Sequence, residues 1–212
     1  AARAMSEAEA PRGELAGFVL AGGASLRMGR AKALLEIAGE TQIARVARLV
    51  GRAAANCSIV GEVAGWPSCG FSVIADRWPG TGPLGGMATA LGASGAEWNL
   101  MVACDMPYLT QEWLAHLAGR ALGSRADAVI PMTERGAEPL CAAYNRSAEP
   151  LLRGALERGV RKVREALEEL RVERLEPAEW KGFDSGGRLF KNMNAPADYE
   201  EARAWFAAHR KP

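Results

Sequence analysis

The sequence of 212 residues has only two histidines and four cysteines. His116 and His209 lie far apart, each in a segment with a helical pattern, so a histidine-based triad or a multi-histidine metal centre has almost no material. No Cys-x-x-Cys pair is present, which argues against a zinc site or a redox relay. We expect all four cysteines to be reduced and to pack as small hydrophobic side chains: Cys57, Cys69, Cys104 and Cys141.

An excess of charge of one sign is also missing. The 26 basic and 25 acidic residues leave a formal net charge of +1, so no overall field attracts a polyanion and the balance argues against nucleic-acid and membrane-surface binding. No apolar run approaches the roughly 18 residues of a membrane span. Residues 1–13 lack the apolar core of a signal peptide. We therefore expect a cytoplasmic protein with neither nucleic-acid nor membrane partners.

The composition is otherwise that of a globular protein, with 49% hydrophobic and 24% charged residues. The length suits one domain. Residues 1–14 show no periodicity, so we expect a flexible N-terminal arm followed by a single domain over residues 15–212.

Short apolar runs alternate with helical patterns from residue 17 onward. This alternation predicts an α/β fold, in which helices flank a mostly parallel sheet. Ile43, Val46, Ala47 and Val50 form an amphipathic stripe that predicts a helix after Thr41. Strands are expected at 17–21, 57–61, 71–75, 99–103, 128–130 and 140–144, and further helices at 87–91, after 110, at 147–157, at 161–170 and from 196.

A glycine turn rich in basic residues follows the first expected strand. Paired glycines let backbone amides converge on an anion, and Gly22 and Gly23 stand directly after Leu20-Ala21. Arg27, Arg30 and Lys32 add positive charge within a few positions. The spacing is not that of a Walker A loop, because five residues rather than four separate Gly23 from Gly29. The loop predicts a phosphate-binding site, with an ordinary tight turn as the alternative.

Two aspartates stand just beyond expected strands, Asp76 and Asp105. Ligands of open α/β sheets bind at the carboxyl ends of strands, so these carboxylates fall where chemistry is expected. A single carboxylate opposite a phosphate loop suits Mg²⁺, which keeps water and substrate oxygens in most of its shell. Alternatively, either aspartate caps the next turn.

Two further segments have an unusual composition. Residues 80–86 contain four glycines, which suits either a loop that closes over a flat ligand such as a purine base or a flexible connection. Asn192 and Asn194 occupy alternate positions, hence one face of an extended chain, just before Pro196. Asparagine pairs also serve as turn formers and helix caps.

Taken together, these motifs resemble the molybdenum cofactor guanylyltransferase family. The resemblance extends over residues 17 to 206 and implies a single Rossmann-like nucleotidyltransferase domain. It rests on Leu20-Ala21-Gly22-Gly23, Ser25, Arg27-Met28-Gly29, Lys32, Gly82-Pro83-Leu84, Cys104-Asp105-Met106-Pro107, Pro139-Leu140-Cys141-Ala142, Tyr144 and Asn192-Met193-Asn194-Ala195-Pro196.

The resemblance implies an enzyme that transfers GMP from GTP to the phosphate of molybdenum-loaded molybdopterin and releases pyrophosphate, with Mg²⁺ as cofactor. Arg27, Lys32 and Asp105 are the implied catalytic residues, and Asp105 is also the implied metal ligand. The implied nucleotide contacts are Leu20, Ala21, Gly22, Gly23, Lys32, Asp76 and Asp105. Asn192 and Asn194 match an element that the family places near the pterin substrate.

Two alternatives to guanylyl transfer remain. One is a cytidylyltransferase of the same scaffold that acts on molybdopterin or another phosphorylated acceptor. Gly22, where the cytidylyltransferases have alanine, favours GTP over CTP. The other is a non-catalytic nucleotide- or cofactor-binding module, which would not need both Lys32 and Asp105. The resemblance also implies transient contacts with molybdoenzyme chaperones or cofactor-insertion proteins.

Overall fold

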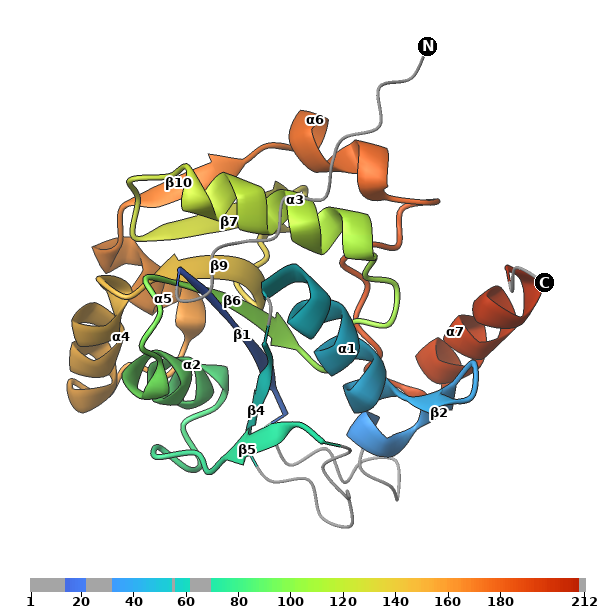
Figure 1. Ribbon diagram of the computed structural model, residues 1–212, viewed down its shortest axis with the longest axis horizontal. Helices are drawn as coiled ribbons and strands as arrows, with labels where there is room; N and C mark the ends of the chain where they lie inside the picture. The colour runs from blue at the N-terminus through green and yellow to red at the C-terminus, as the bar shows by residue number, and fades with distance from the viewer. Residues whose placement is uncertain (1–13, 22–31, 55, 62–69, 210–212) are drawn as a thin grey trace.

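The computed structural model describes residues 14–21, 32–54, 56–61 and 70–209 (Figure 1). Most of the expected N-terminal arm and all but the ends of the glycine turn lie outside these ranges. A mixed sheet forms the centre, with strands in the order β10-β7-β9-β6-β1-β4-β5 and β8 paired with β7. The strands are β1 (Leu15–Leu20), β4 (Ser58–Val60), β5 (Ser72–Ile74), β6 (Trp98–Ala103), β7 (Ala128–Thr133), β8 (Gly136–Ala137), β9 (Cys141–Asn145) and β10 (Val172–Leu175).

The predicted sheet is confirmed as mostly parallel. The β1, β4, β5 and β6 pairings are parallel, and β9 runs antiparallel between β6 and β7. Leu20 aligns with Ala103 on one side and with Val60 on the other, and Val60 aligns with Ile74. The ends of four strands therefore meet along one border of the sheet, which we call the carboxyl edge.

Helices cover both faces of the sheet, as Figure 1 shows. Successive residues of β1 alternate between the two faces: Leu15 and Val19 join the core with α1 and α3, whereas Phe18 and Leu20 join the core with α2 and α4. Burial on both faces explains why the strand sequences are continuously apolar. The helices are α1 (Gln42–Ala54), α2 (Pro83–Ala93), α3 (Gln111–Leu122), α4 (Ala148–Glu157), α5 (Val163–Ala166), α6 (Pro177–Trp180) and α7 (Pro196–Ala208).

A smaller cluster attaches the C-terminal helix. It joins α7 to the two-stranded sheet of β2 (Glu36–Ile37) and β3 (Glu40–Thr41), and the Tyr199 hydroxyl donates to the Glu36 carbonyl at 3.0 Å. Tyr108 packs edge-on against Trp205, with ring centroids 5.5 Å apart. The helix expected from Pro196 is confirmed, and its position follows from these aromatic contacts.

Several predicted boundaries were wrong. The helix expected at 87–91 begins at Pro83, because proline suits the first helical position, and the segment expected at 161–170 splits into α5 and a 3-10 turn, Leu167–Glu169. The hairpins and β10 were missed because their strands are short. The cap expected at Thr110 is confirmed, since its hydroxyl accepts from the Trp113 amide at 3.2 Å.

Three cysteines fall within the described residues, and all are free thiols. Burial raises the pKa of both Cys57 and Cys141 to about 12, and Cys141 Sγ lies 3.3 Å from the indole nitrogen of Trp113. These thiols are protonated at neutral pH and contribute packing. Cys69 lies outside the described ranges. None of the helices described here is long and apolar enough to cross a membrane.

Candidate functional site

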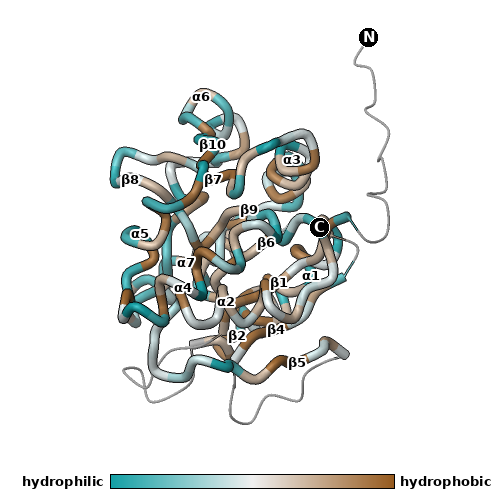
Figure 2. Tube along the Cα trace, turned by 90° about the vertical axis from the view of Figure 1, so that its left-hand side faces the viewer, coloured by the Kyte–Doolittle hydropathy of each residue, from teal (hydrophilic) through white to brown (hydrophobic). Residues whose placement is uncertain are grey.

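The backbone stays paired just beyond the strands at the carboxyl edge. The Ala21 amide donates to the Val60 carbonyl at 2.9 Å, and the Cys104 amide donates to the Leu20 carbonyl at 3.2 Å. The chain therefore enters the glycine turn between β4 and β6. Figure 2 shows that β1 and β4, which lead to this point, are hydrophobic along their length. Leu20 and Ala21 thus stand where the strand order reverses, which is where α/β sheets bind ligands.

The predicted phosphate-loop residues are only partly described. Leu20 is buried, Ala21 is half-buried, and both lie at the end of β1. Lys32 begins a 3-10 turn, Lys32–Leu34, that precedes β2. Gly22, Gly23 and Arg27 lie outside the described residues, so their roles remain predictions.

The structure brings Asp105 together with the C-terminal asparagine segment. The Met193 amide donates to the Asp105 carbonyl at 2.8 Å, although the two residues are far apart in the sequence. Asn192 is half-buried and its Oδ1 atom is buried without a hydrogen-bond partner among the described residues. Asn194 is exposed, and its amide donates to Asp198 Oδ2 at 2.9 Å at the start of α7. The two asparagines therefore have different environments on one segment.

Asp76 has a structural role in its own turn. Its Oδ1 atom accepts from the Trp78 amide at 2.9 Å and from the buried Thr89 hydroxyl at 3.0 Å, which ties the β5 end to α2. Two strands, β1 and β4, lie between β5 and β6. At a strand spacing of about 4.8 Å, the ends that lead to Asp76 and Asp105 are roughly 14 Å apart. The strand order therefore separates the two loops that carry these carboxylates.

The glycine-rich segment 80–86 is only half a loop. Gly80 and Gly82 have φ values of +78° and +73°, a region that disfavours other residues, whereas residues 83–86 form the first turn of α2. A side chain at Gly85 would place Cβ 2.8 Å from the Trp78 carbonyl oxygen. Close packing therefore explains this glycine. The segment expected either to close over a flat ligand or to serve as a flexible connection is a loop only over residues 80–82.

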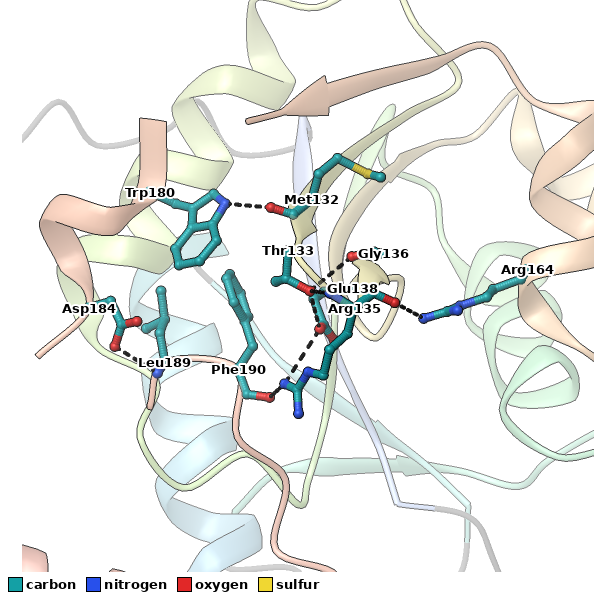
Figure 3. Close-up of polar contacts among 10 residues, drawn as sticks. All are labelled: Met132, Thr133, Arg135, Gly136, Glu138, Arg164, Trp180, Asp184, Leu189 and Phe190. Carbon is teal, nitrogen blue, oxygen red and sulfur yellow. Dashed lines mark hydrogen bonds and ion pairs between the residues drawn. The ribbon is translucent and has the colours of Figure 1, made fainter. Parts of the chain in front are cut away.

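One polar cluster at the carboxyl edge was missed from the sequence. Figure 3 shows Thr133, Arg135 and Glu138 gathered at the β7–β8 hairpin. Glu138 Oε1 accepts from the Thr133 hydroxyl at 3.1 Å and lies 3.8 Å from an Arg135 nitrogen. Burial raises the pKa of the Glu138 carboxyl, against the opposing effect of Thr133 and Arg135. The available signal was its position directly before Pro139-Leu140-Cys141-Ala142.

A magnesium ion held largely by substrate would need only one carboxylate from this chain. The described residues include no group of three or more metal-ligating side chains. Mg²⁺ does not need such a cage, because one carboxylate with phosphate oxygens and water completes its octahedral shell. Asp105, two residues beyond the end of β6, is the carboxylate to which the family resemblance assigns this role.

Comparison with known proteins defines the class first. The family model described as "MobA-like NTP transferase domain" matches residues 17–172, so the chain belongs to this family and is a nucleotidyltransferase. The resemblance noted from the motifs is thus confirmed.

Similar proteins narrow this class to the molybdenum cofactor guanylyltransferases. The chain is 30% identical to "Molybdenum cofactor guanylyltransferase" of Desulfosudis oleivorans over 92% of its own length and 96% of the relative. It is 31% identical to "Probable molybdenum cofactor guanylyltransferase" of Chloroflexus aggregans, over 90% and 94%. The crystal structure of molybdopterin-guanine dinucleotide biosynthesis protein A from Archaeoglobus fulgidus matches with a TM-score of 0.77 at 27% identity, over 91% of this chain and 99% of that chain.

Proposed function

We propose that this chain transfers GMP from GTP to the phosphate of molybdenum-loaded molybdopterin and releases pyrophosphate. The family and the near-complete coverage of the named guanylyltransferases support this assignment. The hydrogen bond between Met193 and Asp105 carries it, because it joins the strand end beside the glycine turn to the asparagine segment. This contact supports a proposal in which the GTP site and the pterin site adjoin at the carboxyl edge.

The protein contributes to this reaction by positioning the substrates and neutralising their charge. The acceptor phosphate oxygen attacks the α-phosphorus in line, and the bond to the bridging oxygen breaks as pyrophosphate leaves. In the proposed arrangement the Gly22 and Gly23 amides, Arg27 and Lys32 hold the triphosphate, and Asp105 holds Mg²⁺. The chemistry that Mg²⁺ supplies when bound is neutralisation of charge on the transferring group. No covalent intermediate with the protein is needed.

Nucleotide choice tests the assignment most directly. The purified protein is titrated calorimetrically with GTP, CTP and ATP, each with and without Mg²⁺. We expect Mg²⁺-assisted binding of GTP in preference to CTP and ATP. A preference for CTP would overturn the guanylyl assignment in favour of the related cytidylyl reaction.

Turnover tests the transfer step. Under anaerobic conditions the protein is mixed with GTP and molybdenum-loaded molybdopterin, and the dinucleotide and pyrophosphate are quantified by chromatography. Equal yields of the two products are expected. Nucleotide binding without any pyrophosphate would instead support the non-catalytic module.

A further inference from the structure

The carboxyl edge continues beyond Asp105 into a part of the sheet that the proposed nucleotide contacts do not use. The Ala103 amide donates to the Leu140 carbonyl at 2.7 Å, which places the segment before β9 next to the end of β6. Glu138 lies two residues before Leu140 in that segment. This carboxylate is therefore on the side of Asp105 away from β1 and β4.

The same cluster is tied to the asparagine segment. One Arg135 guanidinium nitrogen lies 3.5 Å from the Phe190 carbonyl, as Figure 3 shows, and Phe190 is two residues before Asn192. Met193 in turn bonds to Asp105. Hydrogen bonds from the Arg135 side chain and from the Met193 amide thus link the hairpin of Glu138, the asparagine segment and Asp105 along one border.

The bonding of Glu138 leaves acceptor capacity. Its side chain is 15% exposed, whereas that of Arg135 is 70% exposed, so the carboxylate is largely desolvated but can still be reached. Among the described residues, its hydrogen bond with Thr133 and its ion pair with Arg135 both use Oε1. A carboxylate has lone pairs for several donors, so Oε2 is available to a ligand.

We propose that Glu138 is a specificity-determining residue that accepts hydrogen bonds from the amino-amide edge of the pterin ring of the acceptor. That edge presents an exocyclic amino group beside a ring N–H, and the lone pairs of one carboxylate oxygen can accept from it. Thr133 and Arg135 position the carboxylate by fixing Oε1, and Oε2 receives the ligand. This inference rests on the proposed function for the identity of the acceptor.

Equilibrium binding tests Glu138 without turnover. The probes are a fluorescent oxidised pterin and the matching lumazine, in which oxygen replaces the exocyclic amino group. Wild-type protein should bind the pterin more tightly, and Glu138→Gln should lose that preference by about 10- to 100-fold, as expected for a hydrogen bond to a charged group. The matched control is Glu134→Gln, an exposed carboxylate of the same hairpin, which should keep the preference.

Kinetics with molybdenum-loaded molybdopterin supply the second arm. Glu138→Gln should raise KM for the acceptor by a similar factor while KM for GTP and the melting temperature stay at wild-type values. An unchanged pterin preference in Glu138→Gln would overturn the proposal. So would a loss of pterin binding that is accompanied by a similar loss of GTP affinity and by a lower melting temperature. If wild-type protein discriminates pterin from lumazine through Glu138 but forms no dinucleotide, the proposed function fails while the pterin site stands.

Discussion

The two borders of the central sheet treat their carboxylates differently. At the amino ends of β7 and β10, buried Asp127 accepts from the Arg171 amide and Nε at 3.0 Å each, from Arg171 Nη2 at 2.9 Å and from the Ser147 hydroxyl at 2.6 Å. Both of its oxygens are thereby used within the fold. At the carboxyl edge, the contacts of Glu138 use one oxygen, and the buried Asn192 Oδ1 has no hydrogen-bond partner among the described residues.

The difference separates polar groups that the fold itself saturates from polar groups that keep capacity for a ligand. A carboxylate that the chain itself saturates adds stability and has little capacity left for a ligand. Acceptors that the chain leaves available contribute less to stability but can bind a ligand. On this basis, substitutions at the amino border should change unfolding, and substitutions at the carboxyl edge should change turnover.

Asp105→Asn should have the largest effect. Loss of the proposed metal carboxylate removes several kcal/mol of transition-state stabilisation, or roughly a thousandfold in kcat. Turnover is measured as pyrophosphate release over a range of Mg²⁺ concentrations. The melting temperature should stay near wild type, and a variant with full Mg²⁺-dependent turnover would remove Asp105 from the site.

Lys32→Ala and Arg27→Ala should each lower kcat/KM for GTP by about 10- to 100-fold, corresponding to one charged hydrogen bond of roughly 1.5–3 kcal/mol. The measurement is initial rate against GTP concentration. Arg52→Ala, near the end of α1 and exposed, is the matched control. Unchanged kinetics in Lys32→Ala would contradict the predicted phosphate contact.

Asp127→Asn should have the opposite effect, lowering stability without lowering turnover. The isosteric amide keeps the shape but loses charge-assisted hydrogen bonds, so we expect a loss of about 2 kcal/mol in the free energy of unfolding and wild-type turnover. Hydrogen bonds from Arg171 first, then from Ser147, lower the pKa of the Asp127 carboxyl against the opposing effect of burial.

The pH dependence sharpens this prediction. Because the folded pKa lies below the unfolded value, the stabilisation is complete above the unfolded pKa of about 3.9 and is lost as pH falls toward the folded pKa. Urea unfolding should give a difference in the free energy of unfolding between wild type and Asp127→Asn that is constant near neutral pH and decreases only below about pH 4. A difference that already decreases between neutral pH and pH 5 would contradict the assignment of this pH dependence to Asp127.

Asp76 should show the smallest effect and combine both behaviours. Asp76→Ala removes the acceptor for Trp78 and Thr89, so we expect a loss of about 1 kcal/mol in stability and weaker GTP binding. Asp76→Asn retains Oδ1 and should keep most of the stability. Calorimetry and urea unfolding of both variants separate the turn from the nucleotide contact, and equal stability losses would contradict the structural role.

Much of the fold was predictable because its signals are local. The apolar strand of β1, the stripe of α1 and the cap at Thr110 depend on residues a few positions apart. Segments with few local contacts were harder to predict. The short β10 is stabilised by its neighbour β7, and α5 and α6 are each a single turn.

The sequence by itself determined which residues stand at the ends of strands, and so placed the glycine turn, Asp76 and Asp105 in loops that can carry chemistry. Only the tertiary structure decided which of them meet. Strand order separates Asp76 from Asp105, and a backbone hydrogen bond brings Asp105 to Met193. The physical reason is that local pattern sets which face and end a residue occupies, whereas contacts between distant segments depend on how strands pair and helices pack.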